Sequence, residues 1–326
     1  MDLFTHVLVA YLVTFGVVGF QPQYLAAGAL AGGLPDADAL LFPLARRFPI
    51  LRHHGITHSL TGVTVVALVG AFVGPMLAPG SPYVYFLVVE VGGLAHVAQD
   101  GFTNFAVPPL LPFSKRSLHL DADRAINFLT MAVSIASFYL LLGVERNHVP
   151  FAWYLVTVYV LMAFFVAYFA VRLAGRVVVG RRMHPLGYQA VVPMGNPFTW
   201  VLLSEENRGG RVRTRWARYT FGRGVVDGPY SVDAPIEPPP HAGVPSSAVE
   251  ALDWSYGLAR RASRVIESTY HFGEAFVSAA GEWVAVWYSL EFTAFGRASA
   301  VRVRFPTGGE SPIVKSAFYR PLHRAV

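Results

Sequence analysis

Histidine and aspartate residues gather in two neighbouring stretches of an otherwise apolar N-terminal half. Three histidines lie in HHGITHS at 53–59, and two aspartates lie in LPDADALL at 34–41. The chain contains no cysteine, so a metal site here cannot use thiolate ligands. Neutral imidazole and carboxylate oxygen are then the ligands available to Zn²⁺ and similar divalent ions. The two stretches are therefore either polar loops between helices or parts of a metal site.

Two further segments supply the same residue types. His96 and Asp100 are four residues apart within an apolar run, a spacing that places both side chains on one face of a helix. His6 lies near the start of the first apolar run. Together these residues predict a site for a divalent metal, with zinc as the expected ion. The predicted ligands are His6, Asp36, Asp38, His53, His58, His96 and Asp100. This set exceeds the needs of one tetrahedral ion, so some members orient the ligands or two ions bind.

Each segment taken alone has a simpler interpretation. Pro35 followed by aspartates is typical of a turn that ends one helix and caps the next. In HHGITHS, Thr57 can cap the helix that follows, and His6 can pack at a helix end. A single pair such as His96 and Asp100 has little specificity. The metal site is favoured because all these residues fall on the same side of the predicted helices.

The elements that must position these side chains are long apolar runs. Of the 326 residues, 54% are hydrophobic and 14% charged, whereas soluble domains carry about a quarter charged residues. Each run is long enough to cross, or nearly cross, a hydrocarbon layer of ~30 Å. The runs cover 3–20, 24–42, 59–78, 83–107, 125–143 and 151–174. The predicted fold is an all-α polytopic membrane domain of about six transmembrane helices over 1–179, followed by a small soluble α+β domain over 180–326. The Gly- and Ala-rich second run is expected either to pack tightly against its neighbours or to be only partly inserted in the membrane.

Basic residues predict the orientation of the membrane domain. Arginines and lysines concentrate after the second, fourth and sixth runs. The positive-inside rule therefore places both termini, the soluble domain and the metal site on the cytoplasmic side of a multi-pass inner or plasma membrane protein, with lipids as its immediate partners. Lys115 and Arg116 lie on this side and can also attract a phosphate-bearing substrate. Glu90, inside the fourth run, is a candidate functional carboxylate, but its position away from the ligand face favours an interhelical hydrogen bond.

The C-terminal part has the sequence pattern of strands and one helix. Alternating and β-branched residues predict strands in four segments: HPLGYQAVVPMGNPFTWVLL at 184–203, GGRVRTRWARYTFG at 209–222, EWVAVWYSLEFTAF at 282–295 and SAVRVRFP at 299–306. The segment from Ser246 to about residue 280 predicts a helix. The arginines of 211–218 are assigned to a solvated strand face, so there is no strong case for nucleic acid as a partner.

Three motifs, taken together, resemble the YdjM-like family of membrane-bound, predicted metal-dependent hydrolases. They are LPDAD at 34–38, HHGITHS at 53–59 and LAHVAQDGFTNFAVPPLLPF at 94–113. The family pattern has PDxD, then HRGxTHS, then HxxxDxxT before a Pro-rich segment. His54 stands where the family usually has arginine, and Ala106 where glycine is usual, so an arginine role does not carry over. The resemblance implies a membrane-embedded hydrolase that depends on a divalent metal.

These observations favour an integral membrane hydrolase that acts on a phosphoester or ester, with lipids among the candidate substrates, at the cytoplasmic face. A bound ion would acidify a water molecule and polarise the electrophile, while a histidine or aspartate outside the ligand set would transfer protons. His54 and Asp38 are the predicted catalytic residues. The predicted substrate-binding residues are Thr57, Ser59, Thr103, Lys115 and Arg116.

Two other functions are compatible with the same residues. A metal-ion or proton-coupled transporter would need polar groups along a whole pathway and internal repeats, whereas here the polar groups gather at one side. A non-catalytic scaffold would use the metal only to hold helices together. Metal content and hydrolysis, measured on the same protein, separate these alternatives.

Overall fold

The computed structural model describes residues 1–41, 48, 50, 54–104, 106–124, 127–146, 150–236, 244–262, 271–294 and 297–319. These residues form two compact units, Met1–Gly175 and Arg176–Val326. Each unit has hydrophobic clusters of its own.

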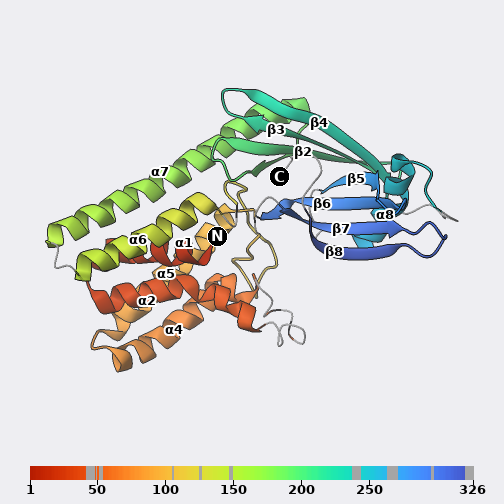
Figure 1. The fold of residues 1–326 in the computed structure, drawn as a ribbon. Coiled ribbons are helices and arrows are strands. Elements are labelled where there is room, and N and C mark those ends of the chain that lie inside the picture. Colours follow the sequence, from red (N-terminus) through yellow and green to blue (C-terminus); the bar gives the residue numbers. More distant parts are fainter. Residues whose placement is uncertain are drawn as a thin grey trace. The chain divides into compact units, whose positions relative to one another are not determined.

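The first unit is helical (Figure 1). Its elements are α1 (Leu3–Val18), α2 (Pro22–Gly33), the 3₁₀ helices η1 (Pro35–Leu41) and η3 (Ile56–His58), α4 (Leu60–Leu77), α5 (Pro82–Phe102), α6 (Phe128–Arg146) and most of α7 (Phe151–Met183). Helix starts are defined by side-chain caps. The Asp2 carboxylate accepts from the Thr5 backbone N–H at 3.0 Å, and Ser59 Oγ accepts from Gly62 N–H at 3.1 Å.

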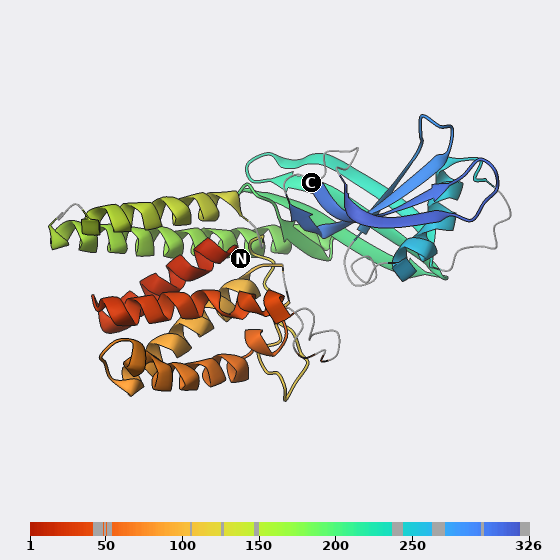
Figure 2. The ribbon, with the colours of Figure 1, turned by 60° about the horizontal axis from the view of Figure 1, so that its bottom comes forward.

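Helix α2 packs closely against α1 and α5 because glycines line both contacts. A Cβ atom at Gly28 would lie 2.1 Å from Thr14 Oγ1 in α1, and one at Gly92 would lie 2.2 Å from the Gly28 carbonyl oxygen. At Gly32, a Cβ atom would lie 2.3 Å from that of Ala10. The expected tight packing of the Gly- and Ala-rich segment is confirmed. It brings the start of α1 and the ends of α2 and α5 to the same side of the unit (Figure 2).

The prediction of about six transmembrane helices is wrong. Among the described residues, two helices are long and apolar enough to cross a membrane, Leu60–Leu77 and Phe151–Leu186. Helix α1 has 16 residues, about 24 Å at ~1.5 Å per residue, and α2 has only 12. The apolar run over 24–42 passes through Pro35, where the chain leaves α2 and enters η1. Sequence windows thus counted loop and 3₁₀ residues as helix.

Helix α5 has 21 residues, but its polar side chains reduce its hydropathy below that of a typical span. One of them, Glu90, accepts a hydrogen bond from Thr64 Oγ1 of α4 at 3.0 Å. The interpretation of Glu90 as an interhelical contact is confirmed. His96, Gln99 and Asp100 lie toward the C-terminal end of α5.

A buried ionic network anchors the segment that follows α5. Asp123 accepts hydrogen bonds from Asn127 Nδ2 at 2.9 Å and from the Tyr168 hydroxyl at 2.6 Å. Arg172 Nη2 lies 3.0 Å from the same carboxylate, and both side chains of this ion pair are fully buried. Asp123 also pairs with Thr103 in an isolated β-bridge. Asp123 therefore connects the segment after α5 to the start of α6 and to α7.

The described residues of the second unit include two four-stranded antiparallel sheets, the end of α7, the 3₁₀ helix η4 (His184–Leu186) and helix α8, consistent with the predicted C-terminal α+β domain. The sheets are β1 (Ala190–Pro193), β2 (Thr199–Arg208), β3 (Arg211–Thr220) and β4 (Gly224–Pro235), then β5 (His271–Val277), β6 (Trp283–Ala294), β7 (Arg297–Phe305) and β8 (Ile313–Tyr319), each in sequential order. Helix α8 (Ala248–Ala262) shares their core, in which Trp287 Nε1 donates to Ser255 Oγ at 2.9 Å.

The helix predicted from Ser246 to about residue 280 is too long. Helix α8 begins after Ser247, whose Oγ accepts from the Glu250 backbone N–H at 3.2 Å. Residues 271–277 form β5 instead, paired with β6. A Cβ atom at Gly273 of β5 would lie 2.8 Å from the ring of Trp287 in β6, so glycine allows the close contact between these strands. The sequence around 271–277 does not indicate this pairing.

Candidate metal centre

Three segments bring four potential ligands together at one side of the helical unit. Asp36 comes from η1, His58 from η3, and His96 and Asp100 from the last turns of α5. One ligand atom of each residue lies within 4.8 Å of the others. His58, His96 and Asp100 are buried, and Asp36 is partly exposed. These four residues were all predicted as ligands, and they can hold a metal ion.

The separations between ligand atoms fit a shared coordination sphere. His58 Nε2 lies 3.4 Å and His96 Nε2 3.3 Å from Asp100 Oδ2. Asp36 Oδ1 lies 3.6 Å from His58 Nε2 and 3.7 Å from His96 Nε2. Ligands placed ~2.1 Å from a tetrahedral ion are about 3.4 Å apart. His96 Nε2 and Asp100 Oδ2 are buried and form no hydrogen bond within the described residues. The donor set therefore fits one divalent ion.

His96 is oriented through its second ring nitrogen. The Nδ1–H group donates to the Gly32 carbonyl oxygen at 2.7 Å, which leaves the Nε2 lone pair directed toward Asp36 and Asp100. The close contact of Gly32 with α1 holds this carbonyl in position. Sequence reasoning missed this contact, because a backbone carbonyl has no residue signature. Only the glycine-rich pattern of α2 indicated close packing there.

His58 is oriented in the same way by a carboxylate. Asp38 Oδ2 lies 3.3 Å from His58 Nδ1, on the far side of the ring from Asp100. Thr57 Oγ1 donates to Asp38 Oδ2 at 2.6 Å and lies 3.0 Å from His58 Nδ1. A carboxylate that binds the second nitrogen of a ligating histidine fixes its tautomer and increases its basicity. Asp38 and Thr57 thus lie where they can orient His58.

His6 contacts the other oxygen of the Asp100 carboxylate. Its Nε2 lies 3.1 Å from Asp100 Oδ1, and its ring stacks on His96 with centroids 3.8 Å apart. The amino group of Met1 contacts the same oxygen. Both groups hold the Asp100 carboxylate so that Oδ2 faces His58 and His96. His6 therefore lies beside the four clustered ligands, next to the carboxylate oxygen that faces away from them.

His54 lies at the edge of the cluster. Its ring stacks on His58 with centroids 4.6 Å apart, and its Nε2 lies 3.8 Å from Asp100 Oδ2. The side chain is 14% exposed, whereas His58 and His96 are fully buried. His54 also has a positive φ of 59°, a left-handed conformation that costs about 1–3 kcal/mol and is concentrated at functional sites. It is a histidine of the cluster that solvent or a substrate can reach.

Negative charge in the cluster favours a bound cation. Burial alone would lower the pKa of His58, but the neighbouring carboxylates, Asp100 foremost, raise it to about 10. Burial acts to raise the pKa of Asp36, yet its contact with His58 and the charge of His96 lower it overall. A divalent ion in the same place would offset the three carboxylates more fully than one proton.

The other predicted site residues have different positions. Ser59 and Thr103 are fully buried at helix ends, where Thr103 Oγ1 donates to the Asp100 carbonyl at 2.8 Å and Ser59 caps α4. Lys115 and Arg116 are exposed after α5, and within the described chain neither side chain contacts the cluster. His53 lies outside the described residues.

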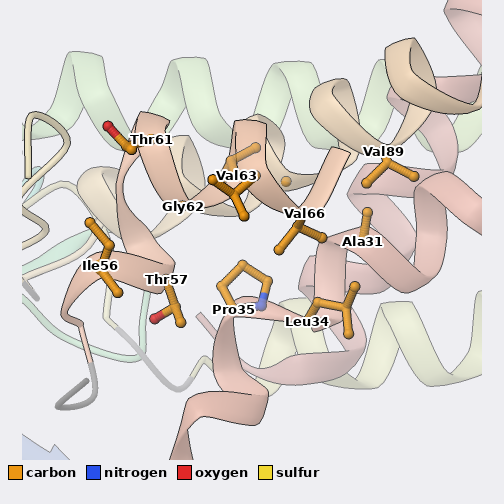
Figure 3. A pocket seen from close by; sticks show the side chains of 12 residues that line it. Ala31, Leu34, Pro35, Ile56, Thr57, Thr61, Gly62, Val63, Val66 and Val89 are labelled. Carbon is orange, nitrogen blue, oxygen red and sulfur yellow. The ribbon is translucent and has the colours of Figure 1, made fainter. Parts of the chain in front are cut away.

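A cavity of about 250 Å³ adjoins the candidate metal centre (Figure 3). It lies between the end of α2, η1, η3 and the facing sides of α4 and α5. Figure 3 shows Val63, Val66 and Val89 pointing into it from α4 and α5, with Thr57 and Pro35 at its other side. The lining is almost entirely apolar. Nothing in the local sequence pattern distinguished these valines from lipid-facing ones.

Among the described residues, two helices are long and apolar enough to cross a membrane, and a largely buried His/Asp cluster lies where it can hold a metal ion between helix ends. The chain belongs to the YdjM inner membrane protein family, because the model of that family matches residues 1–176, more than half of its length. This confirms the resemblance indicated by the three motifs. By their descriptions, members of this family are inner membrane proteins.

A curated relative is the inner membrane protein YbcI of Escherichia coli (strain K12), 31% identical over 103 residues. The match covers 31% of this chain and 60% of that protein, less than two thirds of the relative's length. No solved structure matches the chain.

Proposed function

We propose that this protein is a membrane hydrolase that requires a divalent metal ion, with zinc as the expected ion, and cleaves a phosphoester or an ester. The observation that supports it best is the convergence of Asp36, His58, His96 and Asp100 with separations suited to one ion. His58 and His96 are each oriented through the second ring nitrogen, as in metal sites.

The four clustered residues would hold the ion. When bound, it would supply Lewis acidity that polarises a phosphoryl or carbonyl group and acidifies water. His54 suits the proton transfer that hydrolysis requires, because it is accessible and adjoins Asp100. As water attacks phosphorus or the carbonyl carbon, His54 accepts its proton. The bond to the leaving oxygen then breaks, and the protonated His54 passes this proton to the leaving oxygen. Asp38 orients His58 in this scheme.

The cytoplasmic side of the membrane is the proposed location of the site. Lys115 and Arg116 follow α5, whose last turns carry His96 and Asp100, and short basic segments near membrane helices remain in the cytoplasm. These exposed cations also favour an anionic substrate such as a phosphoester.

Metal analysis and hydrolysis assays on the same preparations test this function. We expect the purified protein to bind about one zinc ion and to hydrolyse bis(p-nitrophenyl) phosphate or a phospholipid in a chelator-sensitive way. Asp100→Ala and His58→Ala should lose both metal and turnover. The matched control is His119→Ala, because His119 is 47% exposed and pairs with Asp121 outside the cluster.

Three outcomes would contradict the proposal. A fully metal-loaded protein without turnover on any ester would favour the scaffold. Zinc flux into liposomes without hydrolysis would favour a transporter. Unchanged metal content in Asp100→Ala would show that the cluster is not the metal site.

A further inference from the structure

The cavity beside the candidate metal centre is formed by the same segments that supply its ligands. Pro35 immediately precedes Asp36, and Thr57 immediately precedes His58. Gly93 of α5 lines the cavity and lies about one helical turn before His96. Thr57 lines the cavity and also donates a hydrogen bond to Asp38. A molecule in the cavity would therefore have one end close to the cluster.

The other side of the cavity meets an exposed apolar surface of α4. Val65 and Val66 line the cavity and are 54% and 38% exposed. Among the described residues of α4, only Val63 and Ala67 are buried, and the helix is long and apolar enough to cross a membrane. Helix α4 begins at Leu60, and at ~1.5 Å per residue Val66 lies about 9 Å along the helix from that start. In a bilayer, this surface contacts lipid chains, so the cavity is accessible from the hydrocarbon layer.

The lining chemistry specifies the kind of ligand. Leu34, Val63, Val66 and Val89 offer no hydrogen bonds, and the hydroxyls of Thr57 and Thr61 are the polar side chains among the lining residues. At about 250 Å³, the cavity lies below the usual range of ~300–1,000 Å³ for small-molecule sites. It is therefore suited to a segment of one hydrocarbon chain and too small for a whole lipid.

We infer that this cavity holds the hydrocarbon chain of an amphipathic ester substrate, which enters sideways from the bilayer and presents its ester or phosphoester group to the cluster. The inference rests on the proposed function and adds the substrate class to it. The chain would contact Val66 and Val89, while the polar group would lie beside Thr57 and His54. Phospholipids and single-chain alkyl phosphates share this chemistry.

A chain-length series tests the inference with the intact protein in lipid nanodiscs. The probes are ethyl, octyl and dodecyl p-nitrophenyl phosphate, which share one reacting group. Each methylene buried in the cavity contributes roughly fourfold in affinity, so we expect dodecyl to exceed ethyl by at least about 50-fold in kcat/KM. Val66→Phe fills the cavity and should reduce that ratio below about fivefold by raising KM for dodecyl alone. Val66→Ala, with a smaller side chain, should keep the preference.

Val69→Phe is the matched control, since Val69 is a 56% exposed residue of the same helix that does not line the cavity. Val69→Phe should keep the wild-type ratio of kcat/KM between dodecyl and ethyl. All three variants should bind as much metal as the wild type. Equal chain preference in Val66→Phe and Val69→Phe would overturn the inference. If the ethyl ester is hydrolysed with metal but no chain preference exists, the chain site is wrong and the proposed function stands.

A binding measurement tests the chain site even if the protein hydrolyses no ester. A phospholipid with a photoreactive diazirine on its acyl chain should label residues around Val66 and Val89 in the wild type and in Val69→Phe. The labelling should fall at least about tenfold in Val66→Phe. If no ester is hydrolysed, the proposed function fails, and this labelling alone decides the chain site. Unchanged labelling in Val66→Phe would then overturn it.

Discussion

At the residue scale, the candidate metal centre depends on how each imidazole uses its two nitrogens. His96 gives one nitrogen to the Gly32 carbonyl, and His58 gives one to Asp38, while the second nitrogen of each faces Asp100. Two histidines fixed in this way cannot rotate to relieve the crowding of their Nε2 atoms. Ligands held by such contacts reduce the ordering cost of binding an ion.

The orientation of His58 leads to a prediction about Asp38. Asp38→Asn removes the charge beside His58 Nδ1 but keeps the side chain nearly the same size. Zinc affinity, measured by competition with a chelator of known affinity, should fall about 10–100-fold without complete loss of the metal. If Asp38 were instead an indispensable ligand, binding would disappear.

The control for this experiment is a similar pair on the surface. His119 Nδ1 lies 2.9 Å from Asp121 Oδ1, and the His119 side chain is 47% exposed. Asp121→Asn should therefore leave zinc affinity unchanged. Equal affinities in the two variants would show that Asp38 does not act on the metal centre.

At the scale of elements, the site depends on how closely α2 approaches α1. Gly32→Ala would place a methyl group 2.3 Å from Ala10 Cβ and 2.9 Å from the His6 carbonyl oxygen. Helix α2 would have to move, and with it the carbonyl that accepts the hydrogen bond from His96. Overpacking of this kind reduces the free energy of unfolding by about 1–3 kcal/mol. We therefore expect a lower melting temperature and weaker zinc binding.

The same substitution elsewhere provides a control. Gly16→Ala in α1 would meet only the flexible end of Met162, at 3.7 Å, and should keep both the melting temperature and the metal. Unchanged zinc affinity in Gly32→Ala would mean that the His96 orientation does not depend on α2.

The sequence predicted some elements of the site and misjudged others for identifiable reasons. His96 and Asp100 were predictable because both lie on one helix, whose periodicity fixes their common face. An orienting role was open to Asp36 and Asp38 alike, but the sequence could not tell which of them has it, because small differences within η1 decide which nitrogen of His58 each carboxylate faces. Span counting failed where apolar residues continued beyond Pro35 into η1. Hydropathy alone does not distinguish the end of a helix from an apolar turn.

At the scale of the whole molecule, the proposed function requires α4 to cross the membrane. Helix α4 begins beside the cluster at Leu60 and ends at Leu77, before a short turn that leads into α5. If α4 spans the bilayer, the turn and the metal centre face opposite compartments. The positive-inside rule, applied to Lys115 and Arg116, then predicts that the candidate metal centre faces the cytoplasm, as we propose.

Cysteine labelling tests this topology directly, because the native chain has no cysteine that would add background. Ser81→Cys places a thiol at the exposed turn between α4 and α5, and Ser117→Cys places one on the exposed segment next to Arg116. A membrane-impermeant maleimide applied to spheroplasts should label only Ser81→Cys, and both variants should react after permeabilisation. Labelling of both from outside would show that α4 does not cross. Labelling of Ser117→Cys alone would place the metal centre on the outer face, where substrate would have to reach it from the opposite leaflet.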